Sequence, residues 1–356
     1  MITLVLTNRN RDLRIVKNCL QSLIQQSCQD FECVVVDYGS DIVYKEHLEQ
    51  LIENYPNIRY IDCPVQGQLW NKARAVNIVL KQATTPYCIV ADIDLIFALG
   101  FIEKAIELVK LDDVYYFQVG FLSKLESQKE KAFEDYHINH VTSSEATGIT
   151  LFPTHLLKSI HGYDEFYHGW GAEDTDIHIR MKNAGYTVSF YDKEILVKHQ
   201  WHPKVYRTKQ STHPFHSLLE RINHAYMVQT QKTQRTLANQ NQEWGKLPTS
   251  KDYKKLANID RQIHLKVSVL EINAFLSQMA NFKEEVVAIE IQAFSRVEKI
   301  KNQVKKILGK KYLPIYDMDT VNNLLLENSI RQYRNNPYTY SFDRQKKLIQ
   351  LIMYFQ

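Results

Sequence analysis

Short apolar segments alternate with amphipathic ones over the first 100 residues. Residues 2–7, 31–37 and 87–91 have apolar centres, and residues 15–24 carry apolar side chains at helical spacing. Strands of this continuous apolar character are typical of a sheet that is buried on both faces. The pattern predicts an α/β domain with a doubly wound, parallel sheet. The alternation continues with a strand at 58–62 and helices at 42–54 and 71–82.

Polar residues follow these strands at the sheet edge where doubly wound folds bind their ligands. The run from Thr7 to Arg11 follows the first strand, and the run from Asp37 to Asp41 follows the second. No Gly-x-Gly-x-x-Gly sequence stands after the first strand. Dinucleotide binding is therefore disfavoured.

Two aspartates, Asp92 and Asp94, stand one residue apart at the end of the strand at 87–91. Strand alternation points both carboxylates the same way, and close carboxylates repel each other unless a cation neutralises them. Oxygen ligands of this kind suit Mg²⁺ or Mn²⁺, which proteins often share with substrate phosphates. Alone, the pair is a weak signal, because a turn or a helix cap also favours aspartate.

A second cluster, residues 162–176, combines glycines with Trp170 and five carboxylates just before an amphipathic helix. Glycine permits close approach of the backbone to a ligand, and the face of Trp170 can pack on a sugar ring. Glu173 or Asp174 at the helix start can act as a general base. The structural alternative is that Asp174 caps the helix, that its acidic neighbours favour the helix dipole and that Trp170 is core.

Taken together, these residues resemble a known family. The segment from Thr147 to Tyr186, with Gly169-Trp170-Gly171-Ala172-Glu173-Asp174, is similar to the carboxyl-terminal catalytic segment of the β-1,4-galactosyltransferases and bacterial chondroitin polymerases. These belong to the wider family 2 glycosyltransferases of GT-A fold. The resemblance covers roughly residues 1–205, where it implies a GT-A doubly wound mixed sheet, and then stops. Beyond it, the sequence itself predicts a basic, mainly helical carboxyl-terminal region over residues 206–356.

The resemblance also implies a donor site. Residues 7–11 are similar to the family's nucleotide contact, residues 37–40 to its Asp-x-Gly-Ser motif and residues 71–74 to its Asn-Arg-Ala segment. Asp92 and Ile93 are expected to contact the donor as well. Asp37 is expected to contact the uracil or the ribose of a UDP-sugar. The residues expected to bind the donor are Thr7, Asn8, Arg9, Arg11, Asp37, Gly39, Ser40, Asn71, Lys72, Arg74, Asp92 and Ile93.

A metal site follows from the same resemblance. Asp94 would coordinate Mn²⁺ (or Mg²⁺), Asp92 would support it, and a histidine that ends the strand at 194–198 would complete the set. His199 fits that place better than His202, which stays the alternative. The family's methionine ligand is replaced by Leu196, which has no donor atom, so the coordination must differ here.

The implied reaction is an inverting transfer of a hexose or N-acetylhexosamine to a glycan or lipid-linked saccharide in surface polysaccharide synthesis. Asp174 would take the acceptor proton, while Glu173, Trp170 and Gly171 would bind the acceptor. A non-catalytic protein that binds nucleotide-sugars or glycans is the alternative. The joint presence of Asp94, a histidine and Asp174 favours the enzyme.

The carboxyl-terminal part differs in charge. Residues 203–356 hold 25 Lys and Arg against 13 Asp and Glu, a net charge of +12, whereas residues 1–202 carry −8. An apolar recurrence from Phe282 to Ile307 at steps of three and four predicts a helix, which would pack in a helical domain or form a coiled coil. The lysines beside it could meet anionic lipid. No recognition motif supports nucleic-acid binding.

The composition, 44% hydrophobic and 24% charged, is that of a globular protein. Asp92 and Asp94 interrupt the longest apolar run, which excludes a membrane span there. The apolar start at residues 2–7 is too short for a signal sequence, so we expect a cytoplasmic protein. Five cysteines without a Cys-x-x-Cys pair indicate neither a disulfide framework nor a zinc–cysteine site.

Overall fold

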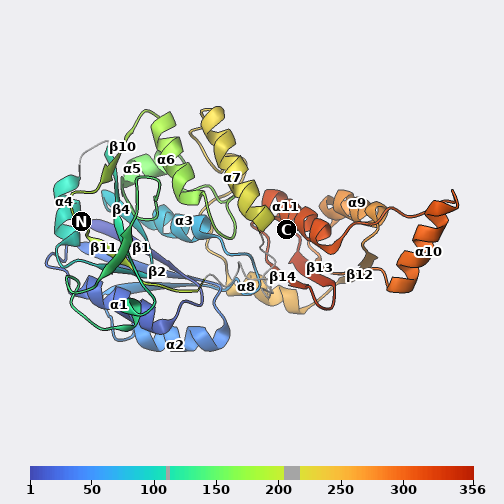
Figure 1. Ribbon diagram of the computed structural model, residues 1–356, viewed down its shortest axis with the longest axis horizontal. Coiled ribbons are helices and arrows are strands. Elements are labelled where there is room, and N and C mark those ends of the chain that lie inside the picture. Colours follow the sequence, from blue (N-terminus) through green and yellow to red (C-terminus); the bar gives the residue numbers. More distant parts are fainter. Residues whose placement is uncertain (110–112, 204–216) are drawn as a thin grey trace. The chain divides into compact units, whose positions relative to one another are not determined.

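The structure is a computed structural model that describes residues 1–109, 113–203 and 217–356 (Figure 1). The chain divides into two compact units. The first holds residues 1–63, 70–203 and 220–247, and the second holds chiefly Pro64–Leu69 and Pro248–Gln356. The domain boundary predicted at 205/206 lies outside the described residues and stays a prediction.

A seven-stranded sheet forms the centre of the first unit, in the order β10-β6-β9-β4-β1-β2-β3. Its middle strands are parallel, whereas β9 runs antiparallel between β4 and β6. The predicted doubly wound mixed sheet is therefore confirmed, and the predicted apolar runs are its buried strands. The strands are β1 (Ile2–Asn8), β2 (Phe31–Tyr38), β3 (Ile58–Cys63), β4 (Tyr87–Asp92), β6 (Asp113–Phe117), β9 (Thr150–Pro153) and β10 (Thr187–Tyr191).

The helices of this unit form where apolar side chains share one face. In α1 the side chain of Asp12 caps the amino terminus by accepting from the Arg14 amide, and the buried face includes Val16 and Leu20. Asn71 caps α3 in the same way. The helices are α1 (Leu13–Ile24), α2 (Ile42–Ile52), α3 (Lys72–Gln82), α4 (Phe101–Leu108), η1 (Glu126–Gln128), α5 (Thr154–Ser159), α6 (Glu173–Asn183) and α7 (Ser217–Lys232).

A second, four-stranded sheet of the same unit has the order β5-β11-β7-β8. It contains β5 (Leu95–Phe97), β7 (Val119–Leu122), β8 (Ile138–Val141) and β11 (Val197–His199). The strands β5 and β11 pair antiparallel, with Leu95 opposite His199. This pairing brings the chain after Asp94 beside the end of β11, which matters for the site below.

The second unit contains the helices that the sequence predicts and a sheet that it does not. Its four strands have the order β12-β13-β15-β14. The helices are α8 (Ser250–Lys254), η3 (Lys255–Ala257), α9 (Val269–Gln278), η4 (Met279–Asn281), α10 (Arg296–Ile307) and α11 (Met318–Gln332), and the strands are β12 (Arg261–Lys266), β13 (Val286–Gln292), β14 (Tyr338–Asp343) and β15 (Leu348–Tyr354).

The continuous helical recurrence predicted from Phe282 to Ile307 is wrong. Its first half is the buried strand β13, and only its second half is a helix, α10. The run Val-Val-Ala-Ile-Glu-Ile is rich in β-branched residues, which favour a strand. Its apolar steps coincide with helical ones by chance. Among the described residues no helix is both long and apolar enough to cross a bilayer.

Candidate functional site

The carboxyl ends of β1, β2 and β4 bring the predicted polar residues together. Asn8 lies opposite Asp37, and Thr7 lies opposite Asp92. The Asn8 amide donates to Asp37 Oδ1 at 2.7 Å, and the Ser40 hydroxyl donates to the same oxygen at 2.6 Å. Burial raises the pKa of Asp37. Its Oδ2 is buried and makes no hydrogen bond with a described residue, so this oxygen can accept from a ligand.

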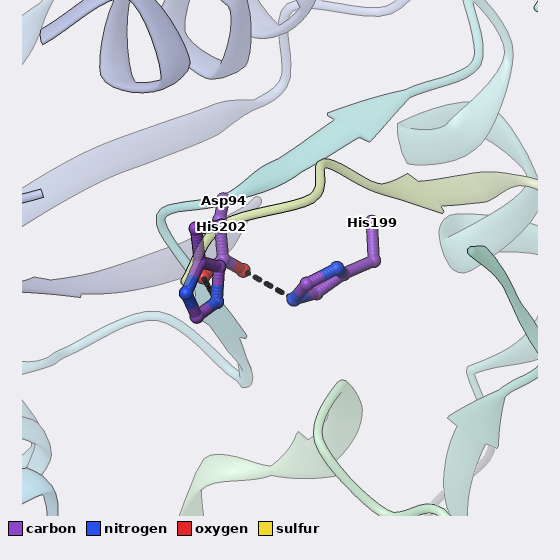
Figure 2. A group of neighbouring side chains, drawn as sticks. All are labelled: Asp94, His199 and His202. Atoms are coloured by element: carbon purple, nitrogen blue, oxygen red, sulfur yellow. Dashed lines mark ion pairs between the residues drawn. The ribbon is translucent and has the colours of Figure 1, made fainter. Parts of the chain in front are cut away.

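Asp94 lies between two histidines, and Figure 2 shows both rings turned toward its carboxylate. Oδ1 is 3.5 Å from His199 Nε2, and Oδ2 is 3.2 Å from His202 Nε2. The Arg11 guanidinium is 3.1 Å from Oδ2. Asp94, His199 and His202 form the cluster of possible metal-ligating side chains found among the described residues. Both histidines that the sequence offered are thus brought to Asp94.

The charges of this cluster suit a cation. Burial alone would raise the pKa of Asp94, but His199, His202 and Arg11 together hold it well below its usual range. Burial lowers the pKa of His199. The carboxylate is therefore ionised and the His199 imidazole neutral near pH 7, which are the forms that bind metals. The His199 ring also stacks on Phe121, with centroids 4.4 Å apart, which fixes its orientation.

Asp92 has a different partner. Its Oδ1 is 2.8 Å from Lys72 Nζ, and the same ammonium is 2.9 Å from Asp174 Oδ2. Lys72 is only 6% exposed and is the first residue of α3. One buried lysine thus joins the strand-end aspartates to the acidic cluster 80 residues further along the chain. Sequence reasoning placed Lys72 in the donor pocket and did not find this bridge.

Asp174 and Glu173 open α6 after a strained turn. Gly171 and Ala172 have φ values of 101° and 76°, in the left-handed region that favours glycine. Burial raises the pKa of Asp174, although Lys72 opposes the shift. Burial and the neighbouring Asp174 raise the pKa of Glu173 to about 7. Asp174 Oδ1 is buried without a hydrogen bond to a described residue, so it can accept a proton.

Two other carboxylates of the acidic cluster are structural. Arg180, fully buried, donates to Asp176 at 2.7 Å and to the carbonyls of Ile160 and Gly162. Arg235 donates to Asp164 at 2.8 Å. These pairs hold α6 and the loop before it in place. Arg235 lies beyond the predicted boundary, and no local sequence signal connects it to Asp164.

The remaining predicted residues are placed as follows. Trp170 is 44% exposed, as a side chain that meets an acceptor requires. The Asn71 side chain caps α3 and donates to the Glu165 carbonyl, and the Arg74 guanidinium donates to the Lys246 carbonyl. These two side chains are buried against protein groups. Gly39 has a positive φ of 78°, Thr7 and Ile93 are buried, and Arg9 is half-buried.

Comparison with known proteins gives two family matches. Residues 3–153 match the family described as glycosyl transferase family 2, and residues 128–203 match the family described as the N-terminal domain of galactosyltransferase. The teichoic acid poly(glycerol phosphate) polymerase of Staphylococcus epidermidis is 34% identical over 94 residues. The matched segment makes up 26% of this chain and 12% of that relative.

Solved structures also resemble the chain. TarS of S. aureus matches 56% of this chain and 36% of its own, with 17% identity and a TM-score of 0.43. GalNAc-T7, solved with UDP, GalNAc and Mn²⁺, matches 65% of this chain and 48% of its own, with 14% identity and a TM-score of 0.47. The chain thus spans less than half of each of these proteins.

Proposed function

We propose that this chain is a family 2 glycosyltransferase that transfers a hexose or N-acetylhexosamine from a UDP-sugar with inversion at the anomeric carbon. The observation that carries the proposal is the Lys72 bridge between Asp92 and Asp174. It joins the strand-end aspartates, where the donor would bind, to Asp174, whose Oδ1 makes no hydrogen bond with a described residue. A donor site and a base in one place are what a direct transfer requires.

A divalent metal fits the cluster of Asp94, His199 and His202. Asp94 Oδ1 is a buried oxygen that makes no hydrogen bond with a described residue, and the neighbouring imidazole is neutral. One carboxylate with two imidazoles suits Mn²⁺ better than Mg²⁺, which prefers oxygen ligands alone. When bound, the ion would neutralise charge on the departing diphosphate. Asp92 as a supporting ligand stays a prediction.

Asp174 is the proposed general base. A sugar hydroxyl is a weak nucleophile, so the proton must leave as the oxygen bonds to the anomeric carbon and the bond to the diphosphate breaks. Asp174 Oδ1 accepts that proton, while the Lys72 ammonium fixes Oδ2. Glu173 and Trp170, with Gly171, would bind the acceptor. Inversion follows because attack and departure occur on opposite faces without an enzyme nucleophile.

The donor nucleotide would lie along the ends of β1 and β2. Asp37 Oδ2 is the acceptor atom for an N–H of the uracil or an O–H of the ribose. Arg11 supplies positive charge beside Asp94, where the diphosphate of the donor would lie. The acceptor we propose is a glycan or a lipid-linked saccharide in the synthesis of a surface polysaccharide or teichoic acid. The reaction would take place on the cytoplasmic side.

The deciding experiment is a UDP-release assay with a panel of UDP-sugars and Mn²⁺. We expect at least one donor to be hydrolysed slowly, and faster when the acceptor is present. Asp174→Asn should bind the same donor with unchanged affinity and release no UDP. A matched control is Asp164→Asn with Arg235→Gln, which changes a buried carboxylate of the same cluster outside the proposed chemistry. Donor binding without turnover in the wild type would instead favour a non-catalytic binding protein.

A further inference from the structure

The helix α10 of the second unit presents an uncovered apolar face. Val297, Ile300, Val304 and Ile307 recur at steps of three, four and three, and their exposed fractions lie between 47% and 76%. At 3.6 residues per turn they share an arc of about 80°. None of the residues of α10 is buried. Figure 1 shows this helix and the turn after it projecting from the rest of the second unit.

The apolar face continues beyond the helix. Leu308, Tyr312 and Leu313 are between 42% and 60% exposed. The Asn302 side chain donates to the Leu313 carbonyl at 2.7 Å and accepts from the Leu313 amide at 2.8 Å. These two bonds fix the following segment against the helix. The apolar surface is therefore ordered by the fold and larger than the helix stripe alone.

Positive charge surrounds this face. Residues 296–311 contain seven Lys and Arg and a single acidic residue, Glu298. The Glu298 carboxylate is already used, because it accepts from the Ser295 amide in a capping box. By helical geometry Arg296 and Lys301 lie on opposite borders of the apolar arc. Long basic side chains at such borders can keep their charges in water while their stems cover apolar surface.

We infer that α10 is a membrane-surface helix that lies in the interface of a bilayer rich in anionic lipid. An apolar face with basic borders is the composition of such helices, which bury that face about 5–10 Å deep. A second copy of the chain is disfavoured as the occupant, because pairing two α10 helices would bring like charges together. A nucleic acid would satisfy the charges but would leave the exposed isoleucines and valines unexplained.

The test uses the full-length protein and sedimentation with vesicles of phosphatidylcholine and phosphatidylglycerol at 3:1, against phosphatidylcholine alone. We expect binding to the anionic vesicles at 0.05 M NaCl, and weaker binding at 0.5 M because salt shortens the range of the charges. The change Ile300→Asp with Val304→Asp should weaken binding at least a hundredfold. Lys301→Gln with Lys305→Gln should weaken it by about fivefold per lysine.

Ile259→Asp is the matched control, because Ile259 is an exposed isoleucine of the same unit outside α10. It should bind like the wild type. All the replaced side chains are exposed, so circular dichroism should be unchanged; the lysine variant tests the inference even if the double aspartate variant misfolds. Vesicle binding is read without any transfer reaction, so the result is independent of the proposed function.

Three outcomes overturn the inference. The first is a wild type that stays in solution with anionic vesicles at low salt. The second is an Ile300→Asp, Val304→Asp variant that binds as the wild type does, which would leave only a charged surface contact. The third is a wild-type dimer that this variant converts to a monomer without any vesicle binding, which would make a second copy the occupant.

Discussion

Replacing Glu173 by Gln should stabilise the first unit, and the gain should grow with pH. Glu173 is 9% exposed, and burial together with the neighbouring Asp174 raises its pKa to about 7 from an ordinary value of 4.5. Below pH 4.5 the residue is protonated in both the folded and the unfolded chain. Between pH 4.5 and 7 the unfolded chain ionises first, so the stability contributed by the protonated form is lost as the pH rises.

The size of this effect follows from the shift. A difference of about 2.5 pKa units at 1.36 kcal/mol per unit is about 3 kcal/mol above pH 7. At pH 5.5 the same reasoning gives about 1 kcal/mol. Glutamine has the size of glutamate but cannot ionise, so the variant avoids the whole cost. We therefore expect Glu173→Gln to exceed the wild type by about 1 kcal/mol at pH 5.5 and by about 3 kcal/mol at pH 8.

Urea unfolding followed by circular dichroism at the two pH values measures this difference, with a chelator present to keep metal ions out. Glu46→Gln is the control, because Glu46 is an exposed glutamate on α2. That variant should follow the wild type at both pH values. A gain from Glu173→Gln that is equal at pH 5.5 and pH 8, or a loss at pH 8, would refute the reasoning.

Three further predictions concern the site. Asp174→Asn should lower kcat by 10²–10⁴ with an unchanged donor KM. Because burial raises the pKa of Asp174 and the base must be ionised, the wild-type rate should fall with acid at a pH above the usual range of an aspartate. Steady-state kinetics over a range of pH measure both effects. His202→Ala should weaken Mn²⁺ binding at least tenfold, as measured by electron paramagnetic resonance. An unchanged affinity would exclude His202 as a metal ligand. Arg235→Gln should cost up to about 3 kcal/mol in urea unfolding, since it leaves Asp164 buried without its arginine, and adding Asp164→Asn should recover most of the loss.

The fold of the first unit could be read from the sequence because its central strands are buried on both faces. Such strands leave continuous apolar runs, and the runs at 2–7, 31–37 and 87–91 are β1, β2 and β4. The second unit gave no such signal. The strand β13 is short and rich in β-branched residues, and its apolar steps matched a helix that the chain does not form there. Periodicity alone cannot separate these two cases over seven residues.

Site residues at the ends of strands could be predicted from the sequence. Contacts that join distant segments of the chain could not. Asp92 and Asp94 were found because the end of a buried strand is a defined place in the fold. The bridge from Lys72 to Asp174 depends on how α3 and α6 pack, and the pairing of Arg235 with Asp164 joins segments 71 residues apart. Neither contact leaves a periodic or compositional trace.

The position of Lys72 is itself evidence for the connection between the two motifs. A cation in the first turn of a helix faces the positive end of the helix dipole, which disfavours it. Burial also lowers the pKa of the Lys72 ammonium, but Asp174 and Asp92 more than compensate and raise it. The lysine is therefore held by these carboxylates and not by its own helix. One ammonium among Asp92, Glu173 and Asp174 leaves the group with excess negative charge, which adds to the effect of burial in raising the pKa of Glu173. Near neutral pH this group can both hold and accept a proton, which is the property that a transfer to a hydroxyl requires.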